Sequence, residues 1–277
     1  MTYATLMVSL ALDQPNAARL AIASQIAERF DAGMIGIVAS TFSPPLYFTT
    51  GEQAQIVIDQ EEASIKRRMA ELETQFREAV KHRARHVEWR SAIDFPARYV
   101  LAQARSADII VSGGASDAFS DPFATVTPGD LVMEAGRPLL VVPDAVDWLD
   151  PRSVLVAWKD TPEARRAIVA ALPMLRNAKD VAIAEIVENG GSHAAAVARV
   201  RDVITWLSRH GVRASELAAK QDEDRDAFAQ LDSMAAGVGA GVIVAGAYGH
   251  SRFRELILGG MTRHLLSQTA RCALLSH

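Results

Sequence analysis

An internal duplication is the feature that most constrains the fold. The motif D-x-P-x-A-x-R occurs at Asp13–Arg19 and again at Asp160–Arg166. A second match joins Ala107–Gly113 to Ala240–Gly246, where an apolar run ends in glycine in both copies. Self-similarity on this scale predicts one structural unit built twice. The chain of 277 residues is long enough for two ordinary domains.

Each copy alternates short apolar runs with longer helical patterns. The expected strands lie at 6–12, 34–39, 86–92, 108–111 and 138–143, and then at 154–157, 181–187, 212–218, 241–245 and 273–275. The expected helices lie at 13–30, 52–82, 96–104, from 130, 162–175, 194–210, 226–236 and 261–268, with Asp13 as the cap of the first. This alternation predicts an α/β fold with right-handed crossovers. We therefore expect two tandem domains, each a five-stranded, mostly parallel sheet flanked by helices.

The predicted domains span residues 1–146 and 152–277, and the linker between them carries Asp147, Asp150 and Pro151. The two copies are expected to pack as an intramolecular pseudo-dimer. The apolar segments at 139–142 and 273–275 are the candidate edge strands for that contact. A homodimer of whole chains stays open at this point.

Composition excludes several classes of function. A net charge of −4 gives no electrostatic reason to expect nucleic acid or an anionic membrane as a partner. No apolar stretch reaches the ~18 residues that a membrane span needs, and residues 6–12 are better interpreted as a buried strand than as a signal segment. The one cysteine, Cys272, is expected to be a small buried residue in a reducing, cytoplasmic environment.

The segment after the last long apolar run carries the candidate chemistry. The run at 242–245 leads into Gly246 and Gly249; nine residues after Gly249 come Gly259 and Gly260, and a helical pattern follows. Glycines at a strand-to-helix turn let the backbone approach a ligand closely. The N–H groups that open the next helix lack partners within it and can hold an anion. Phosphate binding by the main chain is the functional interpretation, and tight turns without a ligand are the structural alternative.

Gly-x₂-Gly-x₉-Gly followed by Ser or Thr is the nucleotide-loop pattern of the universal stress protein family. GAYGHSR with LGGMTRHLL resembles the tandem, two-domain members of that family, except that Gly260 stands where the pattern has Ser or Thr. The resemblance implies a Rossmann-like, adenine nucleotide α-hydrolase-like fold that binds ATP in the second domain. The missing hydroxyl implies weak binding. No visible motif requires Mg²⁺.

The strand order of that family places the first and fourth strands of a copy side by side. The Gly246 loop would then face Lys159 and Asp160, where the family usually has an aspartate in place of Lys159. Arg252 is the candidate fixed cation for the phosphates. The expected nucleotide-binding residues are Gly246, Gly249, His250, Ser251, Arg252, Gly259, Gly260, Met261, Thr262, Lys159 and Asp160.

The first copy has lost the glycine pattern. Ser116 stands three residues after Gly113, and Asp130 takes the Ser/Thr position. An aspartate at a helix start satisfies the positive end of the helix dipole and repels phosphate. The first copy is therefore predicted to be a structural partner without a nucleotide.

No catalytic or metal-binding set is found. His82 and His86 stand four apart, but no further His or Cys lies near them, so no metal site is expected. The sequence favours a stress-response switch that binds ATP or a related adenine nucleotide and is not an enzyme. A ligand-free scaffold and a weak ATPase are the alternatives.

Overall fold

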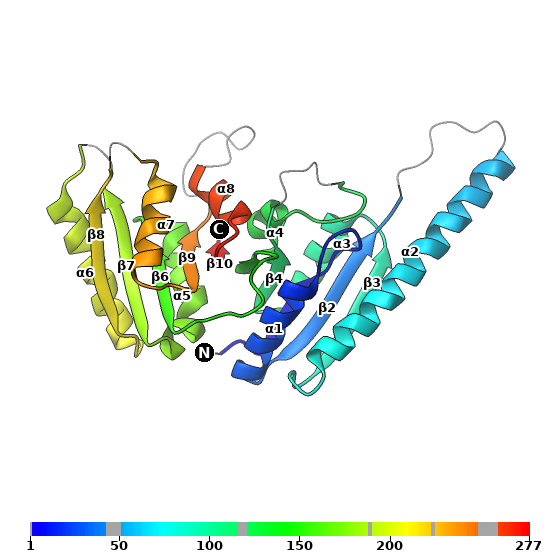
Figure 1. Cartoon of the computed structure of the whole chain (residues 1–277), viewed down its shortest axis with the longest axis horizontal. Helices are drawn as coiled ribbons and strands as arrows, with labels where there is room; N and C mark the ends of the chain where they lie inside the picture. The colour runs from blue at the N-terminus through cyan, green and yellow to red at the C-terminus, as the bar shows by residue number, and fades with distance from the viewer. Residues whose placement is uncertain (1, 43–50, 116–120, 188–189, 223–224, 249–259) are drawn as a thin grey trace.

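Ten strands form one sheet in the order β3-β2-β1-β4-β5-β10-β9-β6-β7-β8. The computed structural model describes the chain except residues 1, 43–50, 116–120, 188–189, 223–224 and 249–259 (Figure 1). Within this sheet each half of the chain contributes five consecutive strands with the same order, which confirms the predicted α/β fold with two five-stranded units. The boundaries at 146 and 152 remain a prediction, because the sheet runs through both halves.

The first half is built as predicted from alternating strands and helices. Its strands are β1 (Thr5–Ser9), β2 (Gly33–Ser40), β3 (Val87–Ile93), β4 (Ile109–Gly113) and β5 (Leu139–Val142). Its helices are α1 (Ala17–Phe30), α2 (Gly51–Val80), α3 (Pro96–Gln103) and α4 (Pro128–Glu134), with a 3₁₀ turn at Ala104–Ser106. All four strand pairings within this half are parallel.

The second half repeats this order. Its strands are β6 (Ser153–Ala157), β7 (Asp180–Val187), β8 (Ala214–Lys220), β9 (Val242–Gly246) and β10 (Cys272–Ser276). Its helices are α5 (Pro162–Asn177), α6 (His193–Arg209), α7 (Ala227–Gly237) and α8 (Gly260–Ser267). The pairings within this half are again parallel, with β6 beside β9 as β1 is beside β4.

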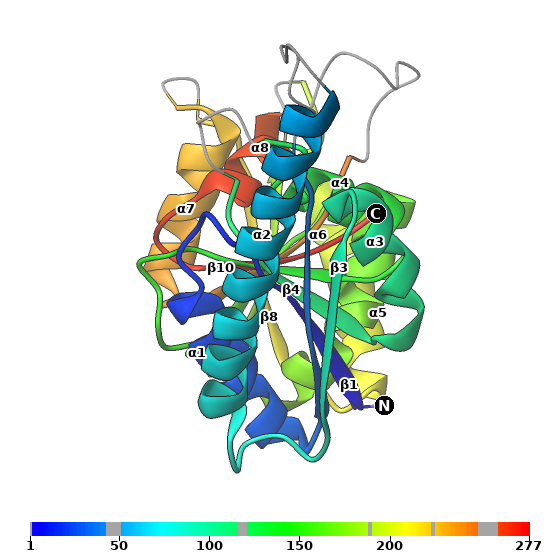
Figure 2. The same ribbon diagram turned by 90° about the vertical axis from the view of Figure 1, so that its right-hand side faces the viewer.

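The two halves join through β5 and β10, as the apolar final segments predicted. These strands pair antiparallel, with Leu140 opposite Leu274. The outer strands of both halves nevertheless run toward the same end, the top of Figures 1 and 2, because each strand of a sheet is rotated relative to its neighbour and the twist accumulates. Away from the sheet, the Tyr3 hydroxyl donates to the Ala170 carbonyl at 2.8 Å and links the start of β1 to α5.

Helices cover both faces of the sheet and bury two apolar clusters. One cluster combines α1, α2, α5 and α6 with strand residues such as Leu6 and Val244. The other combines α3, α4, α7 and α8 with residues such as Met7 and Ile243. Adjacent strand residues enter opposite clusters because side chains alternate across a strand. Residues of several strands are buried on both faces, which explains why those strands are continuous apolar runs.

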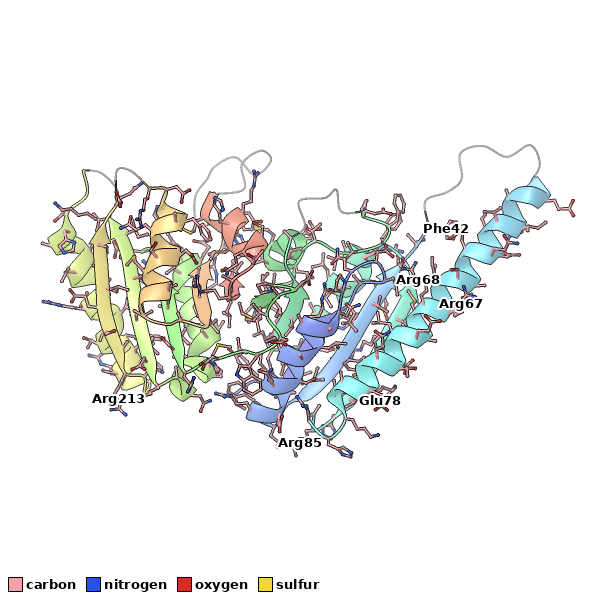
Figure 3. The ribbon with its side chains drawn as sticks, in the orientation of Figure 1. Phe42, Arg67, Arg68, Glu78, Arg85 and Arg213 are labelled. Atoms are coloured by element: carbon pink, nitrogen blue, oxygen red, sulfur yellow. The ribbon has the colours of Figure 1, made fainter. Side chains whose placement is uncertain are left out.

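The start of α1 differs from the prediction. Asp13 is not the cap; the N-cap residue is Asn16, and its side chain bonds both backbone groups of Ala11 instead of the helix. Asp13 forms an ion pair with Arg68, which also donates to the Leu12 carbonyl at 2.9 Å. Arg68 lies on α2 (Figure 3). A distant cation therefore decides the position of the Asp13 carboxylate, and the local sequence could not indicate it.

Candidate functional site

A pocket of about 840 Å³ lies at the carboxyl ends of β6, β7 and β9. The order of strands reverses between β6 and β9, since the chain continues to β7 on one side of β6 and returns to β9 on the other. In parallel α/β sheets, ligands bind in the crevice at such a reversal. Below we call this pocket the β6–β9 crevice.

The crevice brings together the predicted site residues that the structure describes. Six of them line it: Lys159, Asp160, Gly246, Gly260, Met261 and Thr262. The other five predicted residues, Gly249, His250, Ser251, Arg252 and Gly259, lie outside the described residues. The expected approach of the Gly246 strand end to Lys159 and Asp160 is therefore observed.

The end of β6 leads directly into α5. Thr161 caps this helix, with its hydroxyl accepting the Ala164 N–H at 3.3 Å. Asp160 accepts a hydrogen bond from Arg165 at 2.6 Å, so its carboxylate is paired with a neighbouring cation. Lys159 is exposed and lines the crevice. Two cations, Lys159 and Arg165, thus stand near this strand end.

Gly246 is required by packing rather than by backbone angle. A Cβ added to it would lie 2.5 Å from the Ala164 nitrogen and 2.7 Å from the Glu163 carbonyl carbon. The missing side chain lets the end of β9 approach the first turn of α5. This contact closes the base of the crevice.

Thr262 of α8 is hydrogen-bonded to the segment that follows β9. Its hydroxyl accepts the Tyr248 N–H at 3.2 Å, and its side chain is buried. Tyr248 adopts φ 61°, a left-handed conformation that is uncommon for a residue with a side chain. The Thr262 hydroxyl therefore links the end of β9 to α8 within the protein.

Gly260 opens α8 at the edge of the crevice. It is exposed, and a Cβ added to it meets no atom within 4 Å. Its φ is not in the left-handed region, so a residue with a side chain fits this backbone. The first N–H groups of α8 adjoin the crevice at this point.

Six polar residues of the crevice were not predicted: Thr161, Glu185, Ser192, Arg199, Gln221 and Tyr248. Glu185 is buried, and Arg199 of α6 donates to it at 3.1 Å. This hydrogen bond raises the pKa of Arg199, and the nearby charges of Glu185 and Asp160 raise it further. The sequence does place one acid, Glu185, inside the apolar run of β7 and a base, Arg199, on the next helix. Their spacing alone did not predict that they form an ion pair.

The corresponding crevice of the first half is filled. The Arg19 guanidinium lies against Gly113 at the end of β4 and donates to the Ser9 carbonyl at 3.1 Å and to Gln14 at 3.2 Å. Arg19 is only 4% exposed, and the cavity beside it measures about 10 Å³. Burial lowers the pKa of Arg19 to about 10, while the Asp144 charge opposes this shift. An arginine of the protein itself thus occupies the space.

Arg166, the equivalent of Arg19 in the repeated motif, behaves differently. It donates to the His277 carbonyl at 2.8 Å and to Glu163 at 3.0 Å, and half of its side chain is exposed. The β6–β9 crevice is left open as a result. The two copies of one motif place the same residue type in different surroundings.

Asp130 lies where the sequence predicted, at the start of α4. Its N–H donates to the Thr127 hydroxyl at 3.1 Å, and that hydroxyl donates to the Asp130 carboxylate at 2.7 Å. These bonds satisfy the helix start internally. Asp130 therefore lies in the first turn of α4, as the sequence predicted.

Comparison with solved structures identifies the fold. A universal stress protein from Archaeoglobus fulgidus DSM 4304 matches at TM-score 0.66 and 16% identity, covering 99% of this chain and 96% of that one. A protein of unknown function from Pseudomonas aeruginosa PAO1 matches at TM-score 0.60 and 17% identity, covering 99% and 92%. The chain has the universal stress protein fold. No protein-family model matches the sequence, and neither does any curated protein.

The match to the Archaeoglobus universal stress protein spans almost the full length of both chains. This confirms the fold that the family resemblance implied. In the part of the chain that the structure describes, no helix is long and apolar enough to cross a membrane. The same residues contain no group of three or more side chains that could hold a metal ion.

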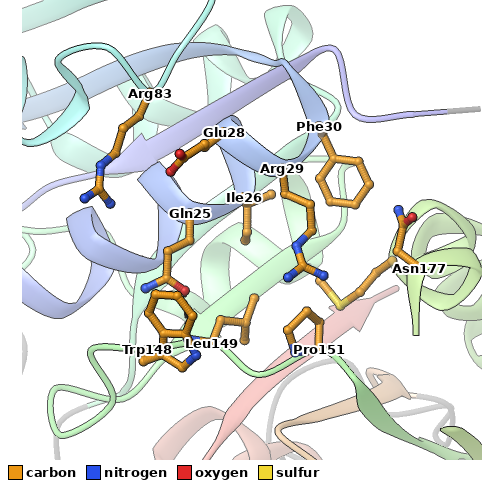
Figure 4. Close-up of a pocket in the computed structure, with 11 residues that line it drawn as sticks. Gln25, Ile26, Glu28, Arg29, Phe30, Arg83, Trp148, Leu149, Pro151 and Asn177 are labelled. Atoms are coloured by element: carbon orange, nitrogen blue, oxygen red, sulfur yellow. Dashed lines mark hydrogen bonds between the residues drawn. The ribbon is translucent and has the colours of Figure 1, made fainter. Parts of the chain in front are cut away.

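A second pocket, about 370 Å³, lies away from the crevice between α1 and the segment that links the halves (Figure 4). Gln25 holds this segment: its amide donates to the Asp147 carbonyl at 3.1 Å and accepts the Leu149 N–H at 3.0 Å. Trp148, between these two residues, is 69% exposed. The linker is therefore fixed to α1 on both sides of an outward-facing indole.

Proposed function

We propose that the chain is a tandem universal stress protein that binds one adenine nucleotide, ATP, in the β6–β9 crevice and acts as a switch. The observation that carries the proposal is the difference between the two reversal points of the sheet. One is an open pocket of about 840 Å³, and the other is filled by Arg19. The proposal thus assigns the nucleotide to the second half and a structural role to the first.

The electrostatics of the crevice suit a polyphosphate. The starts of α5 and α8 both adjoin it through Thr161 and Gly260, and the partial positive charge of a helix N-terminus favours an anion. The lining also carries two cations, Lys159 and Arg199, and two acids, Asp160 and Glu185, of which Glu185 is paired with Arg199. The proposed nucleotide-binding set remains the eleven residues that the sequence predicts, including those of the segment 249–259.

The proposed role is binding and conformational switching rather than turnover. Thr262, a hydroxyl near the predicted phosphates, already accepts a hydrogen bond from Tyr248. Glu185, the buried carboxylate of the crevice, is paired with Arg199. Paired groups of this kind are poor candidates for a general base that activates water. The proposed function has no requirement for Mg²⁺, and the proposed setting is the cytoplasm.

Calorimetric titration with ATP tests this proposal, and two glycine variants sharpen it. Gly260 and Gly51 are each the first residue of a helix, and a Cβ meets nothing within 4 Å at either position. Gly260→Asp should abolish ATP binding because it places a carboxylate beside the phosphates, whereas Gly51→Asp should bind as the wild type does. The wild type should bind about one nucleotide per chain.

Four outcomes would contradict the proposal. A stoichiometry near two would show that Arg19 does not close the first half. Equal ATP affinity of the Gly260→Asp and Gly51→Asp variants would place the phosphates elsewhere. Absence of nucleotide, both in titration and in mass analysis of freshly purified, denatured protein, would favour a ligand-free scaffold. Phosphate release above background would identify a weak ATPase.

A further inference from the structure

The pocket between α1 and the linker, below called the linker pocket, is formed by both halves of the chain. Residues of α1 line one side, Met174 and Asn177 of α5 line another, and Trp148, Leu149 and Pro151 belong to the linker (Figure 4). Pockets that bind small molecules occur preferentially where two structural units meet, and about 370 Å³ lies within their usual range. A small molecule bound here would contact both halves.

The linker pocket is separate from the β6–β9 crevice. It lies where α1 and α5 end, shortly before β2 and β7 begin, and therefore at the amino ends of these strands. The crevice lies at the carboxyl ends of β6, β7 and β9. Among the residues that the structure describes, none lines both cavities. A ligand of the linker pocket thus does not occupy any part of the proposed nucleotide site.

The wall of the linker pocket is apolar, and an exposed indole stands at its edge. Phe30 packs edge-to-face against Tyr3, with ring centroids 5.0 Å apart, so its ring has a fixed position. Trp148 is 69% exposed, and Gln25 bonds the backbone of the residue on either side of it. Aromatic rings pair favourably with one another. The remaining apolar wall comes from Ile26, Leu149, Pro151 and Met174.

Arg29 supplies a positive charge to this apolar pocket. It lies in the last turn of α1, is exposed, and extends toward Pro151 (Figure 4). It forms no hydrogen bond or ion pair with the residues that the structure describes. Hydrogen bonds from Arg152 lower the pKa of the nearby Asp150 to about 2, and the Arg29 charge adds a smaller contribution. Asp150 is thus already paired with Arg152, and the Arg29 guanidinium remains accessible to an anion.

The charges of the lining favour a ligand with a single negative charge. The pocket is lined by two arginines, Arg29 and Arg83, and by one acid, Glu28. Because Glu28 and the neighbouring Asp150 repel anions, the pocket does not suit a triphosphate. A planar guanidinium binds a carboxylate through two parallel hydrogen bonds, which makes a carboxylate the best match for Arg29.

We propose that the linker pocket binds a small aromatic monocarboxylate. The ring lies against the Trp148 indole and the apolar wall, and the carboxylate pairs with Arg29. Burial of the ring supplies affinity, and the guanidinium selects the charged group. This site is additional to the proposed nucleotide site.

Calorimetric titration of the full-length protein with two probes tests the proposal. The probes are 2-naphthoate and 2-naphthalenemethanol, which share one ring system and differ in the carboxylate. Naphthoate should bind at about one molecule per chain with a dissociation constant of about 1 mM or tighter, and the alcohol at least about fivefold more weakly. Arg29→Gln should weaken naphthoate binding by about five- to fiftyfold and change binding of the alcohol by less than about twofold. Arg67→Gln is the matched control, because Arg67 is an exposed arginine of α2 outside the pocket (Figure 3).

Two further variants separate this site from the nucleotide site. Trp148→Ala should weaken both probes by about threefold or more, because both lose the indole contact. Gly260→Asp, designed to abolish ATP binding, should bind naphthoate as the wild type does. Melting curves should match the wild type for all variants at positions 29, 67 and 148, since these side chains are exposed. Absence of naphthoate binding at millimolar concentration, equal affinity of the two probes, equal loss in Arg29→Gln and Arg67→Gln, or unchanged binding in Trp148→Ala would each overturn the proposal.

Discussion

Replacing Gly260 with serine tests the predicted phosphate contact at the start of α8. The universal stress protein pattern has Ser or Thr here, and this chain has glycine. The structure makes the change feasible: Gly260 is exposed, its backbone is not left-handed, and a Cβ meets no atom within 4 Å. The variant therefore adds a hydroxyl at the edge of the crevice without disturbing the packing around it.

The gain in affinity follows from one added hydrogen bond. A net hydrogen bond contributes about 0.5–1.5 kcal/mol, and one to a charged group about 1.5–3 kcal/mol. Because residue 260 is exposed, water competes for the phosphate, and about 0.5–2 kcal/mol is the appropriate range here. Since ~1.4 kcal/mol corresponds to tenfold, ATP should bind roughly two- to thirtyfold more tightly.

Paired calorimetric titrations of wild type and Gly260→Ser at one salt concentration measure this gain. Gly51→Ser is the matched control, because Gly51 also opens a helix in open space. Both serines should raise the melting temperature slightly, since serine loses less backbone entropy than glycine on folding. Only Gly260→Ser should tighten ATP binding. Unchanged affinity in a folded Gly260→Ser variant would refute a phosphate beside residue 260.

Three further perturbations have defined outcomes. Gly246→Ala should lower the free energy of unfolding by about 1–3 kcal/mol, because its Cβ would lie 2.5 Å from the Ala164 nitrogen. Gly260→Ala should not lower it in the same urea titration, because its Cβ meets no atom within 4 Å. Burial raises the pKa of Cys272 to about 12. The unfolded chain then releases the thiol proton first, so stability should fall as the pH rises from about 9 toward 12, by about 1–2 kcal/mol at pH 10, and Cys272→Ala should lack this component. Gln25→Ala removes both hydrogen bonds to the linker and should lower the free energy of unfolding by about 1–3 kcal/mol, measured by thermal unfolding. Equal stability of this variant and the wild type would contradict the attachment of the linker to α1 through Gln25.

Repetition and periodicity predicted the fold well. The duplicated motif and the ten apolar runs correspond to the two five-stranded units, and the edge strands β5 and β10 pair as expected. Apolar runs and duplicated motifs can be recognised in a single sequence. The prediction that Asp13 caps α1 was wrong. The Asp13 carboxylate pairs instead with Arg68, a residue of another helix.

The candidate site was predictable in part for the same reason. Gly246, Gly260 and Lys159 lie at strand or helix ends, and the order of strands brings such ends together. The sequence did not predict that Arg19 fills the first crevice, because Arg166 holds the equivalent position of the repeated motif and both arginines have the same local pattern. Which of the two arginines turns inward depends on remote acceptors, the Ser9 carbonyl for one and the His277 carbonyl for the other.

Closure of the first crevice and support of the second are connected in this structure. The end of β4, where Arg19 fills the crevice, continues to Ala115, whose N–H donates to the Leu266 carbonyl of α8 at 2.7 Å. At the start of α4, the Tyr248 hydroxyl lies 3.5 Å from the place of a Cβ on Gly129, and burial together with the Asp130 charge raises the pKa of Tyr248. The first half therefore contacts both the strand end and the helix that border the open crevice. The first half thereby positions α8, the element whose first N–H groups adjoin the proposed phosphates.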